Sequence, residues 1–112
     1  MEATLFTKII NRDIPADIIF EDDLCLAFRD INPQAPFHAL LIPKLQLPKL
    51  SDSTVSNQDL LGHLMLTAPE IAKQHGHENF RLVVNNGEEA GQTVFHLHLH
   101  ILAGRSLAWP PG

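Results

Sequence analysis

The stretch of alternating histidine and apolar residues near the C-terminus constrains the fold of this chain more than any other feature. His96, His98 and His100 alternate there with leucines and are followed by two further apolar residues. Side chains on a β-strand point alternately to its two faces, so this period of two predicts a half-buried strand over residues 94–103. The three imidazoles would share one face at intervals of about 6.6 Å. The opposite, apolar face would consist of Phe95, Leu97, Leu99 and Ile101.

Three explanations of this histidine row are open. The imidazoles could form a partly solvated sheet face without a function. They could bind a metal, since histidines at i and i+2 can share one Zn²⁺ with a third ligand from elsewhere, although the outer two Cα atoms lie about 13 Å apart. They could also attack phosphorus, because neutral imidazole, with a pKa of about 6.5, is a good nucleophile. In that case His98 would attack while His96 and His100 stabilise charge and transfer protons, which suits one phosphorus atom better than one metal ion.

Composition limits the remaining possibilities. The 112 residues are 45% hydrophobic and 19% charged, as in a soluble globular protein, and we expect a single domain over residues 1–112. A net charge of −5 argues against a broad nucleic-acid surface. Cys25, the one cysteine, cannot form an internal disulfide and is expected to be a buried small residue in a reducing compartment. No secretory leader follows Met1 and no apolar run reaches about 20 residues, so we expect a cytoplasmic protein outside the membrane.

The first half of the chain predicts one short helix and three strands. A short amphipathic helix is expected over residues 4–10, and strands over 18–21 and 24–29 are expected to form a hairpin. A loop with two prolines follows over residues 30–36. The next segment, residues 37–43, is apolar on both faces apart from one histidine, which predicts a central strand.

The second half predicts one long helix and the last two strands. Ser56 is expected to cap the helix, Gly76 to end it, and Pro69 to cause a kink or break near residues 66–69. A fourth strand is expected over residues 80–85, before the histidine strand. Because the strands are not separated regularly by helices, we predict an α+β fold with about five antiparallel strands.

Many further segments, in order, match one known family. The matching segments are Ile9-Ile10, Ile14–Ala16, Ile18–Asp23, Cys25–Phe28, Asp30-Ile31, Pro33–Pro36, Val83–Asn85, Gly91-Gln92 and Trp109–Gly112. Together with the histidine row they resemble the Hint branch of the histidine-triad (HIT) family of nucleotide hydrolases and transferases, over nearly the whole chain. The resemblance implies a HIT-like fold and a homodimer that continues the sheet and packs helices together. We expect no metal ligands and no cofactor.

The resemblance also implies roles for individual histidines. His98 resembles the nucleophile that becomes nucleotidylated, and His96 and His100 resemble the flanking residues that contact the phosphate and the leaving group. His38 resembles a fourth, supporting histidine, although a histidine on an apolar strand could equally be a satisfied core residue. Asp30 resembles the acid that binds the ribose hydroxyls, although an aspartate there could simply start a turn.

Four other residues are implied to contact the substrate. Ile31 and Phe28 resemble residues beside the nucleoside, and Asn85 resembles a polar group near the phosphate, although it too could serve a turn. Trp109 could pack in the tail or complete the site of a neighbouring subunit. The remaining histidines, His63, His75 and His77, are expected to be surface or helix-end residues.

Thr93 departs from the usual pattern of the family, in which Ser is more common at this place. The resemblance implies that its hydroxyl lies near the phosphate. On a straight strand, however, Thr93 would share a face with Phe95 and Leu97, away from the histidines. Its expected role therefore requires the chain to bend before Val94.

These expectations lead to one predicted function and its rivals. The prediction is a phosphoramidase that hydrolyses the P–N bond of adenosine or guanosine 5′-monophosphoramidates through a nucleotidyl-His98 intermediate. Aminoacyl-adenylate mixed anhydrides are a further candidate substrate class. The rivals are a diadenosine polyphosphate hydrolase, a purine nucleotide-binding protein without catalysis, and a metal-binding protein.

Overall fold

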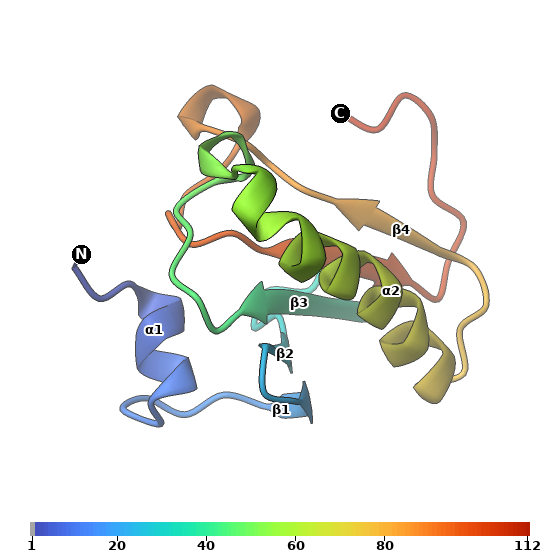
Figure 1. The fold of residues 1–112 in the computed structure, drawn as a ribbon. Helices are drawn as coiled ribbons and strands as arrows, with labels where there is room; N and C mark the ends of the chain where they lie inside the picture. The colour runs from blue at the N-terminus through green and yellow to red at the C-terminus, as the bar shows by residue number, and fades with distance from the viewer. Residues whose placement is uncertain (1) are drawn as a thin grey trace.

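Across residues 2–112, the computed structural model contains one antiparallel sheet of five strands and two α-helices (Figure 1). The strands are β1 (Ile18–Glu21), β2 (Cys25–Arg29), β3 (Phe37–Pro43), β4 (Phe80–Val83) and β5 (Leu99–Ala103). The helices are α1 (Leu5–Ile10) and α2 (Gln58–Gln74), and 3₁₀ turns occur at Leu50–Asp52, Val55–Asn57 and Glu88–Ala90. The predicted α+β class is confirmed. Over the same residues, neither helix combines the length and apolar character needed to cross a membrane.

The spatial order of the strands is β1-β2-β3-β5-β4, which makes β3 the central strand, as predicted. All seven residues of β3 are buried. β1 and β2 form the predicted hairpin. β4 lies at one edge of the sheet, and its last residue, Val83, pairs with His100 of β5. The strand therefore ends two residues earlier than the predicted residue 85.

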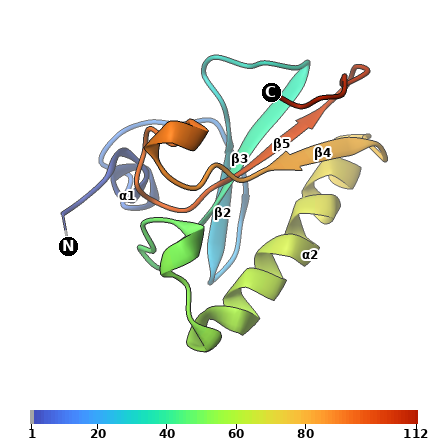
Figure 2. The ribbon, with the colours of Figure 1, turned by 90° about the horizontal axis from the view of Figure 1, so that it is seen from above.

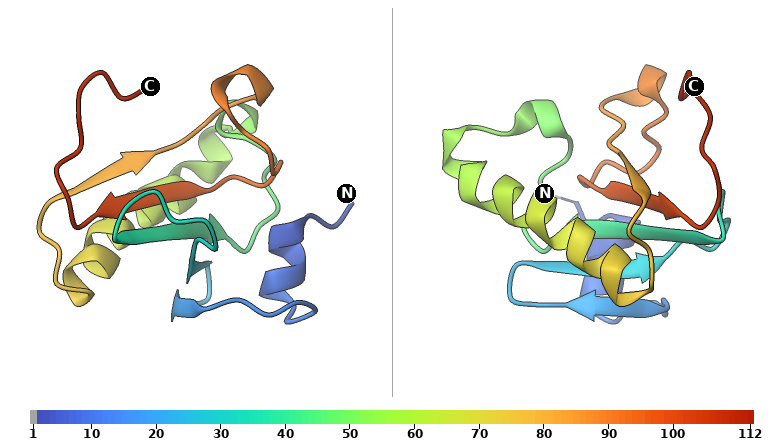
Figure 3. Two further views of the ribbon diagram at one scale, coloured as in Figure 1. Left: turned by 180° about the vertical axis from the view of Figure 1, so that it is seen from behind. Right: turned by 90° about the vertical axis from the view of Figure 1, so that its right-hand side faces the viewer.

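The two helices cover opposite faces of the sheet (Figure 2). The view from behind the sheet shows α2 on the far side of the strands (Figure 3, left). Along β3, Ala39 and Leu41 belong to the apolar cluster under α2, whereas Leu40 and Ile42 belong to the cluster under α1. This alternation is the pleat of a strand that is buried on both sides.

The long helix begins with a different cap from the one predicted. The cap is Thr54 and not Ser56. The Thr54 side chain accepts the backbone N–H of Ser56, and Thr54 forms a capping box with Asn57. The first turn, Val55–Asn57, is 3₁₀ and leads directly into α2. The predicted cap therefore lies two residues too late, because a tight 3₁₀ turn precedes the α-helix.

Pro69 lies inside α2, which is continuous from Gln58 to Gln74, so the break considered near residues 66–69 is absent. A proline in a helix interior costs about 3 kcal/mol. Leu64 and Ile71, on either side of it, are fully buried against the sheet. Their burial contributes about 3–6 kcal/mol in total and so offsets the proline. Gly76 follows the end of the helix with φ of 85°, as predicted.

The histidine strand is shorter than predicted, because β5 begins at Leu99 and the chain bends at residues 94–96. Leu97, Leu99 and Ile101 remain in the core under α2. Phe95, by contrast, is 42% exposed and does not belong to the predicted apolar face. The alternating pattern therefore describes only residues 97–103 correctly.

The bend follows from where the backbone of this segment finds its hydrogen bonds. The Leu97 N–H donates to the carbonyl of Leu47 at 2.7 Å. The side-chain amide of Gln92, which is buried, donates to the carbonyls of Pro48 and Val94. The loop after β3 thus takes the place of a strand partner, which a pattern of single residues does not encode.

Candidate active site

A cavity of about 310 Å³ lies on the α1 face of the sheet and contains most of the predicted site residues. This volume is at the lower end of the range for small-molecule sites. Its apolar wall includes Phe6, Ile9, Phe28, Ile31, Leu40 and Val94. Its polar groups include Asp30, Thr93, His98 and His100. A mainly apolar cavity with a few convergent polar groups is typical of a ligand site.

His98 has a defined tautomer. Its Nδ1 lies 2.8 Å from the backbone carbonyl oxygen of His96. A carbonyl oxygen only accepts, so Nδ1 of His98 carries a proton and donates it. The edge of the Phe6 ring packs on the imidazole, with centroids 5.0 Å apart and the planes at 85°. In the neutral ring, Nε2 therefore keeps its lone pair and is the nitrogen available to a ligand.

His38 and His100 form a chain of hydrogen bonds with a defined direction. The Gln34 backbone N–H donates to His38 Nδ1 at 3.0 Å, so neutral His38 carries its proton on Nε2. That Nε2 lies 2.9 Å from Nδ1 of His100 and donates to it. The proton of neutral His100 is therefore on Nε2. His100 thus has a donor nitrogen to offer to a ligand, where His98 has a lone pair.

The same hydrogen bond argues against a metal ion at this place. Asp30, His38 and His100 offer possible ligand atoms within 4.8 Å of one another. Two nitrogens on one tetrahedral Zn²⁺ are about 3.3 Å apart, given Zn–N distances of about 2.05 Å. The 2.9 Å contact between the two histidines is shorter, and the side chain of His38 is only 4% exposed, so its ring has little room to move apart and admit an ion.

His96 does not face the cavity with its neighbours. Its ring is fully buried, and Nε2 donates to the Pro43 carbonyl at 2.8 Å. Nδ1 is left to accept from the Thr4 hydroxyl at 3.3 Å. The predicted common face of three imidazoles is wrong for this residue, because the bend at residues 94–96 turns its ring away. The backbone carbonyl of His96, however, orients the ring of His98.

Burial lowers the pKa of all four histidines. The pKa of His100 falls to about 4, because of burial and then repulsion from His98 and His38. For His38, His96 and His98, loss of solvation is likewise the largest cause, partly opposed by favourable partners. At neutral pH the rings are therefore uncharged, as the tautomers above require.

The residues predicted to bind the nucleoside lie together at the cavity. Asp30, Phe28 and Ile31 line it, the last with a fully exposed side chain. Asp30 is held by the Asn32 N–H, which donates to Oδ1 at 2.8 Å, and its Oδ2 lies 3.5 Å from Nε2 of His38. Asp30 therefore both begins a turn and faces the site, so the two explanations of this residue do not exclude each other.

Thr93 also lines the cavity, together with Val94. The bend that its expected role requires is present at residues 94–96. Asn85 and Trp109 do not belong to the lining of the cavity. Asn85 lies beyond the end of β4 with its side chain beside Gly91, and Trp109 is 81% exposed in the C-terminal tail. Their contacts with a substrate remain predictions.

Three contributors to the site were not expected from the sequence. Phe6 of α1 packs on His98, Thr4 contacts His96, and the Gln34 backbone orients His38. The amphipathic pattern of residues 4–10 predicts a helix that packs on the sheet, but not which strands it covers. The Gln34 contact is made by the backbone, so no side-chain pattern could have indicated it.

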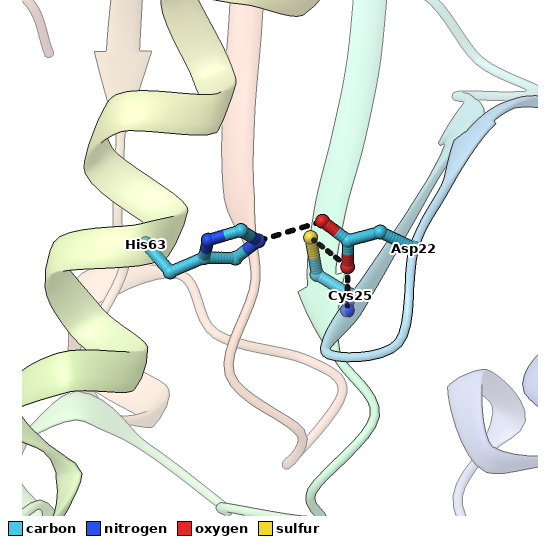
Figure 4. A group of neighbouring side chains, drawn as sticks. All are labelled: Asp22, Cys25 and His63. Atoms are coloured by element: carbon cyan, nitrogen blue, oxygen red, sulfur yellow. Dashed lines mark hydrogen bonds and ion pairs between the residues drawn. The ribbon is translucent and has the colours of Figure 1, made fainter.

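His63 was also interpreted incompletely. It lies half-buried on α2, and its Nε2 is 2.7 Å from Oδ2 of Asp22 in the turn between β1 and β2 (Figure 4). Cys25 is fully buried beside this pair, as predicted from its apolar surroundings. The contact joins the hairpin to the helix and lies on the sheet face opposite the cavity.

A larger depression of about 530 Å³ lies where the loop after α2 meets the loop after β5. Its two arginines are already occupied: Arg81 donates to the carbonyls of Leu107 and Ala108, and Arg105 donates to those of Gln34 and Ser106. The depression therefore has no free cation for an anionic ligand among these two, and the smaller cavity is the better candidate site.

A five-stranded antiparallel sheet that holds a row of hydrogen-bonded histidines at the start of an inner strand defines the histidine-triad class of proteins. The HIT domain family matches residues 11–107, and this chain belongs to that family. It is 64% identical over 112 residues to an uncharacterized HIT-like protein of Synechocystis sp., covering 99% of this chain and 98% of that protein.

Two further relatives extend the comparison. The chain is 50% identical over 112 residues to adenylylsulfatase HINT1 of Arabidopsis thaliana, covering 97% of this chain and 76% of that protein. The crystal structure of a HIT family hydrolase from Legionella pneumophila superposes with a TM-score of 0.96 at 44% identity, covering 98% of this chain and all of that one. The resemblance to the Hint branch is thereby confirmed.

Proposed function

We propose that this HIT-family protein is a nucleotide hydrolase that cleaves the P–N bond of purine nucleoside 5′-monophosphoramidates. The observation that carries the proposal is the pair of tautomers at the cavity. His98 Nδ1 donates to a backbone carbonyl, which leaves Nε2 as a nucleophile, and His38 Nε2 donates to His100, which leaves a donor on His100. The nucleophile, His98, and the donor, His100, lie two residues apart at the start of β5.

In the first step, Nε2 of His98 attacks the α-phosphorus of the bound substrate. The new N–P bond forms as the bond to the amine breaks. Neutral His100 donates a hydrogen bond from Nε2 to the departing nitrogen, and the amine takes its proton from solvent. The imidazolium that results on His98 keeps its Nδ1 hydrogen bond to the His96 carbonyl, which stabilises the positive charge.

In the second step, water attacks the nucleotidyl-His98 intermediate. The N–P bond breaks, His98 regains its neutral form, and the nucleoside monophosphate is released. The sum consumes one water molecule and yields one amine and one monophosphate. Imidazole suits both steps, because its low pKa makes it a nucleophile at neutral pH and a good leaving group afterwards.

The cavity lining suits the nucleoside part of such a substrate. Phe28 and Ile31 offer apolar surface for a purine base, and the carboxylate of Asp30 can accept hydrogen bonds from two ribose hydroxyls. A direct phosphate contact of His96 is not part of the proposal, because that ring is fully buried.

One related substrate deserves direct comparison, because the relative from Arabidopsis thaliana is named an adenylylsulfatase. An adenylyl sulfate differs from the phosphoramidate only in the group that leaves the α-phosphorus. The same nucleotidyl-His98 intermediate would form, and sulfate would leave without needing a proton. The proposal therefore includes adenylyl sulfate as a second substrate of the same site.

Turnover of three substrates by the purified protein tests the proposal: adenosine 5′-monophosphoramidate, adenylyl sulfate and a diadenosine polyphosphate. We expect steady release of AMP from the first, and a loss of at least about 10³-fold in kcat for His98→Ala, with AMP binding retained. His77→Gln, which removes a histidine outside the cavity, should leave kcat unchanged.

Each other result has a defined meaning. Binding of AMP without turnover of any substrate would favour the non-catalytic rival. Turnover of the diadenosine polyphosphate alone would favour the polyphosphate hydrolase. Full activity of the His98→Ala variant would refute the assigned nucleophile.

A further inference from the structure

A second group of chemically reactive side chains lies on the face of the sheet opposite the cavity. It consists of Asp22 in the turn between β1 and β2, Cys25 at the start of β2, and His63 on α2 (Figure 4). One possible ligand atom from each of the three lies within 4.8 Å of the others. None of the three belongs to the cavity, and the proposed hydrolysis does not use them.

The turn holds Asp22 in a fixed orientation. Its Oδ1 accepts the backbone N–H groups of Leu24 and Cys25, both at 2.8 Å, and lies 3.4 Å from Cys25 Sγ, which donates to it. Its Oδ2 accepts a hydrogen bond from His63 Nε2 at 2.7 Å. One carboxylate oxygen thus orders the turn and accepts from the thiol, while the other accepts from His63 on the helix.

We propose that Asp22, Cys25 and His63 bind one Zn²⁺ ion, with water as the fourth ligand. Thiolate, imidazole and carboxylate are the three protein ligands that Zn²⁺ commonly takes, and a mixed set of sulfur, nitrogen and oxygen disfavours Mg²⁺ and Ca²⁺, which prefer oxygen alone. The group unites three different donors, from the β1–β2 turn, from β2 and from α2.

The site needs only a small rearrangement to accept the ion. With Zn–S of about 2.3 Å and Zn–N and Zn–O of about 2.0–2.1 Å, tetrahedral ligand atoms are about 3.3–3.6 Å apart. One ligand atom from each residue already lies within 4.8 Å of the others, and the 2.7 Å contact between His63 Nε2 and Asp22 Oδ2 must lengthen by about 0.6 Å. The side chain of His63 is 34% exposed, so its ring can move outward.

The solvent exposure of Asp22 and His63 gives the ion access to the site and leaves room for a water ligand. Cys25 is fully buried, but the side chains of Asp22 and His63 are 31% and 34% exposed. Their solvent side gives the ion a way in and leaves a position for water. A site of this kind would join the β1–β2 turn to α2 by coordinate bonds in place of one ion pair.

Proton release accompanies the binding. Burial, followed by the hydrogen bond to Asp22, raises the pKa of the Cys25 thiol to about 12, so the sulfur is protonated in the metal-free protein. Zn²⁺ binds the thiolate, and the thiol proton passes to the solvent. Asp22 needs no such step: although its partial burial has the opposite effect, hydrogen bonds from Leu24, His63 and Cys25 lower its pKa to about 2. Affinity should therefore rise with pH.

The first experiment titrates the metal-free protein with ZnCl₂ in competition with a chromophoric chelator. We expect one Zn²⁺ per chain, and an affinity at least about tenfold weaker in His63→Gln and in Cys25→Ala. His77→Gln is the matched control and should bind as the unaltered protein does. Because Cys25 is buried, circular dichroism of each variant checks the fold, and the half-exposed His63 gives an independent result.

The second experiment identifies the ligands. With Co²⁺ as the probe, we expect a thiolate-to-cobalt charge-transfer band in the unaltered protein and its absence in Cys25→Ala. Calorimetry in buffers of different ionisation enthalpy should show release of the thiol proton in the former only.

Three results would overturn the proposal. The first is failure of the unaltered protein to bind Zn²⁺ in the titration. The second is binding that survives His63→Gln but is lost in His100→Gln, which would place the ion among Asp30, His38 and His100 instead. The third is Co²⁺ bound without the thiolate band. None of these depends on phosphoramidase activity, so the two proposals can fail separately.

Discussion

Backbone groups decide which nitrogen carries a proton in His38, His96 and His98, and the hydrogen bond from His38 then decides it in His100. The carbonyl oxygens of His96 and Pro43 each accept from one histidine ring, and the amide of Gln34 donates to His38. None of these three partners is a side-chain charge, so the tautomers depend on the fold alone. The result is that His98 and His100, two residues apart, offer opposite chemistry to the cavity.

We predict that the protein loses stability as the pH falls from about 6.5 toward 4. Burial lowers the pKa of His100 to about 4, whereas in the unfolded chain it is about 6.5. Between these values the unfolded chain binds a proton that the folded chain does not, so the free energy of unfolding falls on acidification. His100 alone contributes on the order of 1–2 kcal/mol between pH 7 and 5, and the other three buried histidines act in the same direction.

Urea titrations at pH 7 and pH 5 measure this difference. Asp22 does not contribute to the difference between pH 7 and pH 5. Its pKa is lowered from 3.8 to about 2, so it changes the free energy of unfolding only at lower pH. His100→Gln should reduce the difference between the two pH values. Equal stability at both, or greater stability at pH 5, would show that the rings are not held neutral.

The residue types of the candidate site could be predicted from the sequence, but not all of their positions. The alternation predicted a shared face for His98 and His100, and both line the cavity at the start of β5. It failed for His96, which precedes the strand and turns into the interior. The roles of Asn85 and Trp109 remain predictions for the same reason: both lie outside regular strands, where spacing does not determine direction.

At the scale of the elements, hydrophobic patterns predicted secondary structure correctly where a segment packs against the segments next to it in the chain. The hairpin and the central strand are as predicted, and the long helix is present but without the expected break. The differences occur where distant backbone supplies the hydrogen bonds, as the loop after β3 does for Leu97, or where burial outweighs a local penalty, as at Pro69. Both effects require the tertiary structure, so single-sequence reasoning could not have anticipated them.

The turn after β5 requires a positive φ at Gly104, which a substitution can test. Gly104 has φ of 97°, and a Cβ there would lie 2.9 Å from Cβ of Pro36. We predict that Gly104→Ala destabilises the protein by about 1–3 kcal/mol, through backbone strain and this contact. Chemical denaturation of the variant and the unaltered protein measures the change.

Gly62 is the matched control for this substitution. It lies in α2, and a Cβ there would meet no atom within 4 Å. Gly62→Ala should therefore stabilise the protein by about 0.5–1 kcal/mol, because alanine favours the helix. Changes of the same sign in the two variants would contradict the proposed cause.

At the scale of the whole molecule, the sheet separates two chemically different faces. The α1 face holds the cavity with His98 and His100, and the α2 face holds the cluster of Asp22, Cys25 and His63. The α+β architecture was predictable from strand count and spacing. The distribution of the two side-chain groups over the two faces was not predictable, because it depends on which face each helix covers.

We predict that the chain forms a homodimer. β4 is an edge strand, and α2 exposes Met65 and Leu66, by 54% and 75% respectively. An unpaired edge beside exposed apolar side chains suits a partner of the same shape. Light scattering after gel filtration should give twice the chain mass, and Leu66→Glu should shift the protein toward monomer.

Leu45→Glu is the control, since Leu45 is also exposed, by 55%, but lies outside α2 and β4. It should leave the dimer intact. A monomer at all concentrations in the unaltered protein would contradict the prediction.

The most direct test of the account is to locate the covalent intermediate. The protein is mixed with an adenosine phosphoramidate, quenched in the first turnover, digested and sequenced by mass spectrometry. The account predicts an adenylyl group on His98 and on no other histidine. An adenylyl group on His96 or His100, or turnover without any labelled histidine, would contradict it.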